Sequence, residues 1–133
     1  MNLRACRVTL TGCTSKYCGM RDVTIYGEGS IICAGCLITV NVTIHEFVIL
    51  NLGCTVGHDT EIGAYSSLML SVNVSGEVEI GEGVYVGTGA KIINRLSIGE
   101  GTIVGAGAVV TGSLPACCTA VGIPAKPIKY HKV

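Results

Sequence analysis

His58 and Asp59 are neighbours in the chain, and together they have the parts of a general base. An imidazole accepts a proton near neutral pH, and an adjacent carboxylate can hold its tautomer and stabilise the imidazolium. A histidine at an exposed corner that bonds only to water is the alternative. The two residues alone leave both interpretations open.

Two further histidines, His45 and His131, are available as metal ligands. His45 takes a place that the surrounding sequence pattern usually gives to glycine, so we expect it exposed at a corner. His131 lies in the C-terminal tail, where we expect it to be solvated. A zinc site needs several such ligands gathered together, and His45 and His58 are expected on different faces. No metal is therefore expected.

These residues belong to a six-residue repeat that runs from Tyr26 to Val110. An aliphatic residue recurs at every sixth position, and four residues after it comes a mostly small or β-branched residue, with Leu96 as the bulky exception. The aliphatic series is Ile32, Ile38, Ile44, Leu50, Val56, Ile62, Leu68, Val74, Ile80, Val86, Ile92, Ile98, Val104 and Val110. A period of six places successive apolar residues on different faces of an α-helix, and the glycine content also opposes helix. The repeat predicts an all-β chain, a single-stranded parallel β-helix.

A longer period of three hexads makes one coil, because the stretch that starts at Ile80 returns at Ile98. Coils should stack at the strand spacing of about 4.8 Å. Stepping by whole coils gives the column Val40, His58, Gly76, Asn94 and Gly112. Because Gly76 has no side chain, we expect open space over the imidazole of His58 and a backbone N–H nearby.

The chain is expected to form one small domain. Residues 1–25 carry no clean hexad pattern and are predicted to form an irregular N-terminal cap over the coil end. Residues 26–115 form the predicted β-helix. Residues 116–133 contain prolines after the repeat has stopped, so we expect an extended C-terminal tail there.

The formal charge is balanced, with nine basic and nine acidic side chains, and no basic stripe is present. Binding to nucleic acid or to an anionic membrane is therefore not expected. No apolar run is long enough to span a bilayer, and the first residues lack the apolar core of a secretory signal. These features predict a cytoplasmic protein.

Eight cysteines raise the question of disulfides or zinc. Cys36 and Cys54 fall on the small inward position, where cysteine acts as a small hydrophobic residue. Cys33 and Cys36 have a CxxC spacing, but they differ in phase and no second pair lies at zinc-ribbon distance. We expect structural thiols. The state of three further cysteines stays open: Cys6, Cys13 and Cys18.

Four stretches, added to the hexads, resemble the left-handed β-helix acyltransferases. They are Asn51 to Asp59, Val72 to Gly76, Gly105 to Val110, and Gly122 to Pro127. The resemblance covers about residues 23–129 and is nearest to the sugar O- and N-acetyltransferases, such as the sialic acid O-acetyltransferases and the bacillosamine-pathway acetyltransferase. It implies a left-handed coil, acetyl-CoA as co-substrate, and a homotrimer with active sites between adjacent subunits.

Site residues follow from this resemblance by position. His58 matches the general base that takes a proton from the acceptor amine or hydroxyl, and Asp59 matches the acidic residue that supports it. Gly76 matches a glycine whose N–H binds the thioester carbonyl. Thr88 and Ala106 match positions whose backbone meets the pantetheine arm of acetyl-CoA.

The sequence departs from the family pattern in two places. Ser67 stands where the bacillosamine branch has a second histidine, and residues 1–25 are too short for the N-terminal βαβ domain that binds a nucleotide sugar. The predicted function is acetyl transfer from acetyl-CoA to an amino or hydroxyl group of a sugar or nucleotide sugar. A carbonic-anhydrase-like metalloenzyme and a non-catalytic β-helix scaffold are the alternatives, and the acceptor stays open.

Overall fold

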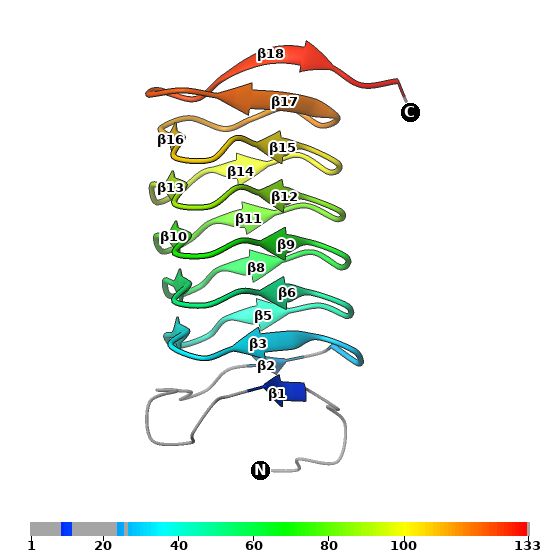
Figure 1. Cartoon of the computed structure of the whole chain (residues 1–133), viewed down its shortest axis with the longest axis vertical. Coiled ribbons are helices and arrows are strands. Elements are labelled where there is room, and N and C mark those ends of the chain that lie inside the picture. The colour runs from blue at the N-terminus through cyan, green and yellow to red at the C-terminus, as the bar shows by residue number, and fades with distance from the viewer. Residues whose placement is uncertain (1–8, 12–23, 26, 133) are drawn as a thin grey trace.

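The computed structural model describes residues 9–11, 24–25 and 27–132, so most of the predicted N-terminal cap, and with it Cys6, Cys13 and Cys18, lies outside the described residues. The described chain is built from short β-strands stacked into a three-sided prism (Figure 1). Strands at the front of Figure 1 run to the left and strands at the back run to the right as the chain climbs, so the coil is left-handed. No described helix is long and apolar enough to cross a membrane.

Three sheets form the sides of the prism, and we name them by their place in Figure 1. The front sheet contains β1 (Thr9–Thr11), β3 (Ile31–Cys33), β6 (Ile49–Leu50), β9 (Ser67–Leu68), β12 (Tyr85–Val86), β15 (Ile103–Val104), β17 (Cys118–Val121) and β18 (Lys126–Tyr130). The side sheet contains β4 (Leu37–Ile38), β7 (Thr55–Val56), β10 (Asn73–Val74), β13 (Lys91–Ile92) and β16 (Val109–Val110). The back sheet contains β2 (Thr24–Ile25), β5 (Thr43–Ile44), β8 (Glu61–Ile62), β11 (Glu79–Ile80) and β14 (Ser97–Ile98).

From β3 to β16, neighbouring strands pair in parallel with residues 18 apart facing one another. In the side sheet, for example, Asn73 pairs with Thr55 below and with Lys91 above. A shift of 18 residues is three hexads, so the predicted coil length is confirmed. Each coil passes from the front sheet to the side sheet and then to the back sheet, which creates three columns of corners.

Every aliphatic residue of the hexad series is buried, which confirms the predicted phase of the repeat. The second inward position is buried as well, and the hydroxyls found there bond to backbone carbonyls of the next coil. Ser66 Oγ donates to the carbonyl of Gly81 at 2.8 Å, and Thr102 Oγ1 donates to that of Pro115 at 2.6 Å. Polar atoms inside the prism are thereby satisfied, as burial requires.

Cys36 and Cys54 are buried in the same inward column, as predicted from their phase. Their Sγ atoms lie 3.1 Å and 2.9 Å from the carbonyl oxygens of Asn51 and Met69. The side-chain hydrogen bond with the Cys54 thiol, followed by burial, raises the pKa of Cys36 well above its ordinary value. This thiol therefore serves as a packing group.

The C-terminal segment folds back on the prism. β17 continues the front sheet above β15, and β18 pairs with β17 in the antiparallel sense. His131 follows this hairpin, is half-buried, and its Nε2 lies 2.8 Å from Oγ1 of Thr119. The expectation that His131 is solvated is therefore wrong, because the hairpin returns it to the sheet.

Candidate active site

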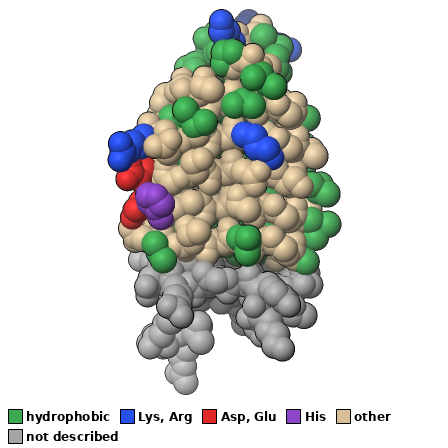
Figure 2. Space-filling model, turned by 90° about the vertical axis from the view of Figure 1, so that its left-hand side faces the viewer, with side chains coloured by type: hydrophobic (Ala, Val, Ile, Leu, Met, Phe, Trp, Pro, Cys, Tyr) green, Lys and Arg blue, Asp and Glu red, His purple; other side chains and the backbone are tan. Residues whose placement is uncertain are grey.

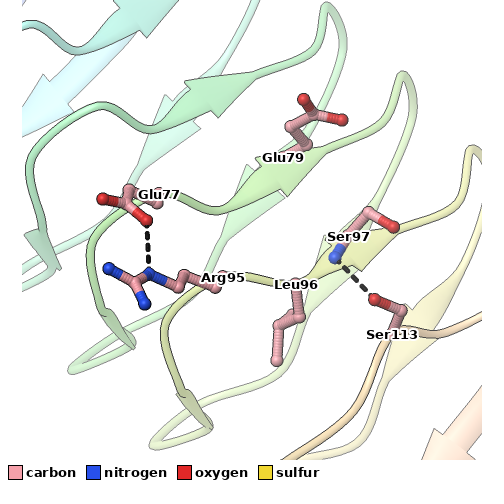
Figure 3. Close-up of a pocket in the computed structure, with 6 residues that line it drawn as sticks. All are labelled: Glu77, Glu79, Arg95, Leu96, Ser97 and Ser113. Atoms are coloured by element: carbon pink, nitrogen blue, oxygen red, sulfur yellow. Dashed lines mark hydrogen bonds and ion pairs between the residues drawn. The ribbon is translucent and has the colours of Figure 1, made fainter.

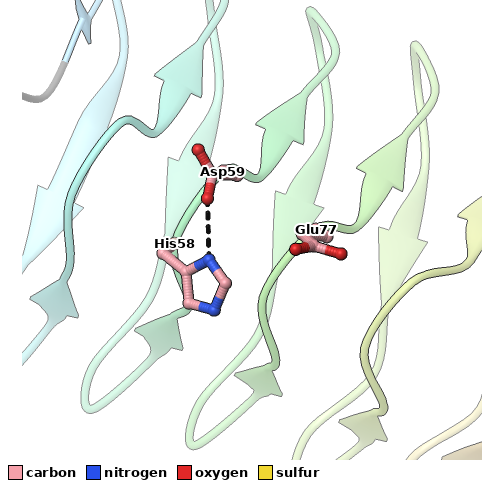
Figure 4. Close-up of side chains that lie close together, drawn as sticks. All are labelled: His58, Asp59 and Glu77. Carbon is pink, nitrogen blue, oxygen red and sulfur yellow. Dashed lines mark hydrogen bonds and ion pairs between the residues drawn. The ribbon is translucent and has the colours of Figure 1, made fainter.

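His58 and Asp59 lie at the corner between β7 of the side sheet and β8 of the back sheet, and both are exposed (Figure 4). Nδ1 of the imidazole and Oδ2 of Asp59 are 2.8 Å apart. An ionised carboxylate has no hydrogen to give, so Nδ1–H donates this bond. In the neutral ring Nε2 then carries the lone pair, which is the arrangement of a general base.

Asp59 is held by a second donor from the coil below. Nδ2 of Asn41 donates to Oδ1 of Asp59 at 2.5 Å, so each carboxylate oxygen has one partner. The bond from Asn41, followed by the bond from His58, lowers the pKa of Asp59 below its ordinary value. The carboxylate of Asp59 therefore stays ionised at neutral pH.

Gly76 lies one coil above His58, as the predicted column requires. The imidazole packs on it so closely that a Cβ on Gly76 would come 2.5 Å from Nε2. The expectation of open space over the ring is therefore wrong: the ring itself fills the space that the missing side chain leaves. Gly76 is consequently buried, and its N–H forms no hydrogen bond with another described residue.

Glu77 is a site residue that the sequence reasoning did not single out. Its carboxylate lies with Asp59 and the His58 ring in one group whose nearest nitrogen and oxygen atoms are all within 4.8 Å of one another (Figure 4). Its backbone N–H donates to the carbonyl of His58 at 2.7 Å. Stepping by one coil from Asp59 reaches Glu77, so the repeat contained the signal that could have found it.

Arg95 lies one further coil up and pairs with Glu77, with Nε donating to Oε2 at 2.7 Å (Figure 3). The side chains of one corner column thus form two pairs, Asn41 with Asp59 and Arg95 with Glu77. A cation bound by His58, Asp59 and Glu77 would compete with Asn41 and Arg95 for the two carboxylates. The other histidines do not join this group, since His45 pairs with Glu61 and His131 bonds to Thr119.

Thr88 and Ala106 lie at the opposite edge of the side sheet, at corners that follow the front sheet. Both are exposed, and neither N–H bonds to another described residue. Gly87 leaves the N–H of Ala106 uncovered, because a Cβ on Gly87 would come 2.6 Å from that nitrogen.

The structure therefore brings His58, Asp59 and Gly76 together at one corner column and puts Thr88 and Ala106 on another. Ser67 is on β9 of the front sheet and does not share either corner.

The outer face of the side sheet separates these two edges (Figure 2). A column of hydrogen-bonded polar side chains runs up this face from coil to coil. Nζ of Lys91 donates to Oδ1 of Asn73 at 2.6 Å, and Nδ2 of Asn73 donates to Oγ1 of Thr55 at 2.7 Å. Figure 2 shows histidine, acidic and basic side chains gathered along one edge of this face. Within one chain the face is open.

A shallow hollow adjoins the His58 corner on the back-sheet side (Figure 3). It has a volume of about 320 Å³ and is lined by Glu77, Glu79, Arg95, Leu96, Ser97 and Ser113. A second hollow of about 430 Å³ shares Glu79 and Ser97 with it. Glu77 therefore belongs both to the His58 group and to the lining of this shallow hollow.

Comparison with known families matches residues 76–112 to the bacterial transferase hexapeptide, a family described as six repeats. Comparison with curated proteins gives no match. Among solved structures, PerB from Caulobacter crescentus in complex with CoA and GDP-perosamine is 38% identical, with a TM-score of 0.81 over 83% of this chain and 53% of that chain. Other structures of the same protein carry a substitution of one histidine by asparagine or by alanine.

Two further structures are similar. WeeI from Acinetobacter baumannii is 41% identical, with a TM-score of 0.77 over 80% of this chain and 52% of that chain. The acetyltransferase domain of PglB from Neisseria gonorrhoeae in complex with acetyl coenzyme A is 33% identical, with a TM-score of 0.80 over 82% of this chain and 53% of that chain. The chain spans about half the length of each. It is thus a hexapeptide-repeat β-helix that shares its fold with about half the length of these sugar N-acetyltransferases and is 33% to 41% identical to them over the aligned residues.

Proposed function

We propose that the protein is an acetyl-CoA-dependent acetyltransferase that acetylates an amino group of a sugar. One observation carries the proposal: the Nδ1–H of His58 is held by Asp59, and its Nε2 lies against Gly76. That arrangement sets a neutral base beside an N–H that has no partner among the described residues. Similarity to N-acetyltransferases solved with CoA, acetyl coenzyme A or GDP-perosamine supports the same reaction.

In this mechanism Nε2 of His58 takes a proton from the acceptor nitrogen as that nitrogen attacks the thioester carbonyl. Asp59 keeps the hydrogen on Nδ1 and stabilises the imidazolium that forms. The N–H of Gly76 would donate to the carbonyl oxygen, where negative charge develops in the tetrahedral intermediate. His58 then gives its proton to the departing thiolate.

We propose that the working form is a homotrimer whose sites lie between adjacent subunits. One chain keeps Thr88 and Ala106 on the far edge of the side sheet from His58, and its open face cannot enclose a long ligand. Cofactor sites are usually clefts that bury most of the ligand. A neighbouring prism would supply the second wall, and three-fold packing closes a ring of triangular prisms.

The acceptor is a small sugar or nucleotide sugar, as the ligand of PerB supports. An acetyl-CoA-dependent reaction also agrees with the cytoplasmic location predicted from the sequence. The test is release of free thiol from acetyl-CoA in the presence of GDP-perosamine, with wild-type protein and with His58→Ala. The proposal expects turnover that depends on both the sugar and His58. Stoichiometric zinc without sugar-dependent turnover would favour the metalloenzyme, and failure to bind acetyl-CoA would favour the scaffold.

A further inference from the structure

We propose that Arg95 binds a phosphate of the acceptor through the two terminal nitrogens of its guanidinium group. This inference rests on the proposed function and specifies its substrate: a sugar that is acetylated while a phosphate is still attached to it. Arg95 acts in binding only, since a guanidinium group stays protonated in proteins and exchanges no proton with the acceptor.

The first support is that one edge of the guanidinium group has no partner among the described residues. Nε of Arg95 donates to Oε2 of Glu77 at 2.7 Å, and neither terminal nitrogen bonds to another described residue. The Arg95 side chain is 74% exposed, so a ligand can reach this edge. A guanidinium group presents parallel N–H donors that match two oxygens of a phosphate. Arg95 therefore offers a binding place for one phosphate group.

The second support is the position of Arg95 relative to the base. Glu77, which accepts the bond from Arg95, belongs to the His58 group, whose nearest nitrogen and oxygen atoms lie within 4.8 Å of one another. The imidazole and the guanidinium group are therefore both neighbours of one carboxylate. A single sugar ring can span such a gap, with its amino group beside Nε2 of His58 and its phosphate on Arg95.

The third support is the shallow hollow beside Arg95 (Figure 3). Ser97 and Ser113 line it together with Arg95, and a serine hydroxyl can both donate to and accept from the hydroxyls of a sugar. Glu77 and Glu79 also line the hollow, and their carboxylates repel a phosphate. Within this lining a phosphate is therefore favoured only where the guanidinium group meets it.

The other described lysine and arginine side chains do not have this position. Nζ of Lys91 bonds to the carbonyl of Ser71 and to Oδ1 of Asn73, on the outer face of the side sheet. The remaining ones belong to the C-terminal segment and are Lys126, Lys129 and Lys132. Among the described cations, Arg95 alone bonds to a member of the His58 group. A phosphate close to the acetylated nitrogen would therefore meet Arg95.

The test compares wild type with Arg95→Gln, using GDP-perosamine and, as the acceptor without a phosphate, perosamine. With GDP-perosamine we expect KM to rise about ten- to hundredfold, as loss of a charge-assisted hydrogen bond predicts. KM for perosamine and for acetyl-CoA should stay unchanged, and kcat should change less than KM. A rise in KM for acetyl-CoA alone would assign the guanidinium edge to a coenzyme phosphate and refute the inference. Lys132→Gln, which removes one exposed positive charge from the C-terminal segment, is the control and should leave all these values unchanged.

A second background separates direct binding from relief of repulsion. Arg95→Gln removes the ion pair of Glu77, and the carboxylate left behind would itself repel a phosphate. The same comparison is therefore made in Glu77→Gln protein, where this repulsion is absent. Direct binding requires that Arg95→Gln still raises KM for GDP-perosamine there. If KM no longer depends on residue 95, Arg95 only neutralises Glu77 and the inference is wrong.

Calorimetry with GDP separates this inference from the proposed function, because GDP carries phosphates and no sugar amine. Wild type should bind GDP about ten- to hundredfold more tightly than Arg95→Gln does. This difference without acetyl transfer by wild type would refute the proposed function and leave the phosphate site supported. Acetyl transfer to GDP-perosamine with equal KM in the two proteins would refute the inference alone. Failure of wild type to bind either GDP or GDP-perosamine would overturn both.

Discussion

The Nε2 atom of His58 packs against the Cα of Gly76, leaving no room there for a methyl group. Glycine at this position is needed for the space that a side chain would fill. It is not needed for an unusual backbone conformation, since Gly76 is not among the glycines with positive φ. One residue therefore sets the position of the imidazole, and the same residue brings its N–H next to the base.

Gly76→Ala should displace the imidazole and reduce acetyl transfer. The added Cβ would lie 2.5 Å from Nε2, so the ring must swing away from the backbone N–H that we assign to the thioester oxygen. Loss of this alignment is expected to lower kcat about 100-fold, the size of effect that follows loss of one oxyanion donor. Gly112→Ala is the control, because Gly112 stands in the same column and a Cβ there meets no atom within 4 Å. Equal kcat in both variants would contradict the proposed geometry.

His58→Ala should remove the base and leave the fold intact. Its side chain is exposed and packs on no part of the hydrophobic core, so the melting temperature should change little. Turnover should fall about 10²- to 10⁴-fold, the usual contribution of a general base. His45→Ala, which changes a histidine at a different corner, should keep wild-type turnover. A His58→Ala protein with wild-type kcat in a free-thiol assay would exclude His58 as the base.

Asn41→Ala should raise the pKa of Asp59 toward its ordinary value, since the bond from Asn41 is the largest cause of the lowering. A lowered pKa means that ionised Asp59 stabilises the fold above the ordinary value of 3.8 and that this stabilisation is lost as pH falls through the folded-state value. Asn41→Ala should therefore lose the contribution at a higher pH than wild type. Carboxyl chemical shifts followed by NMR titration measure this directly. Asn94→Ala, at an exposed corner position, should leave the titration of Asp59 unchanged.

Ile80→Asp should destabilise the prism by several kcal/mol, of the order of 3 or more, because it buries a carboxylate without a partner. Ile80 is only 3% exposed. Ile93→Asp makes the same change at a residue that is 40% exposed and should have a small effect. Thermal melts of the two variants test the inward phase of the hexad, and similar melting temperatures would show that the phase is wrong.

Sedimentation equilibrium at micromolar concentration tests the homotrimer. We expect a single species at three times the chain mass of 13.7 kDa. A protein that sediments at the monomer mass and still acetylates its acceptor would refute the shared site, and the hairpin of β17 and β18 would then be the candidate second wall.

The core of the fold could be predicted from the sequence because the repeat assigns one inward aliphatic to each side of each coil. Ile32 and Val110 are both buried although they lie at opposite ends of the series. The position of His131 could not be predicted from the repeat, because the repeat ends before it. His131 comes close to Thr119 only because β17 and β18 form a hairpin.

The candidate site was predicted in part. The column of His58 and Gly76 followed from counting by coils, and the pairing of His58 with Asp59 followed from their adjacency. The direction of the imidazole did not, since a side-chain rotamer depends on the packing around it and the ring turned into the space above Gly76. Glu77 was reachable by the same counting, but its pairing with Arg95 depends on side-chain conformations that the repeat leaves free.

From β3 to β16 the register is constant at 18 residues per coil, so each coil adds the same height to the prism. Height along the axis is proportional to residue number, so the 48 residues from His58 to Ala106 correspond to a rise of about 13 Å at a spacing of about 4.8 Å per coil. Insertion or removal of whole coils would change this height only in steps of about 4.8 Å. The length of any molecule that spans the two levels is therefore matched by a count of repeats, and adjustment between steps is left to side chains.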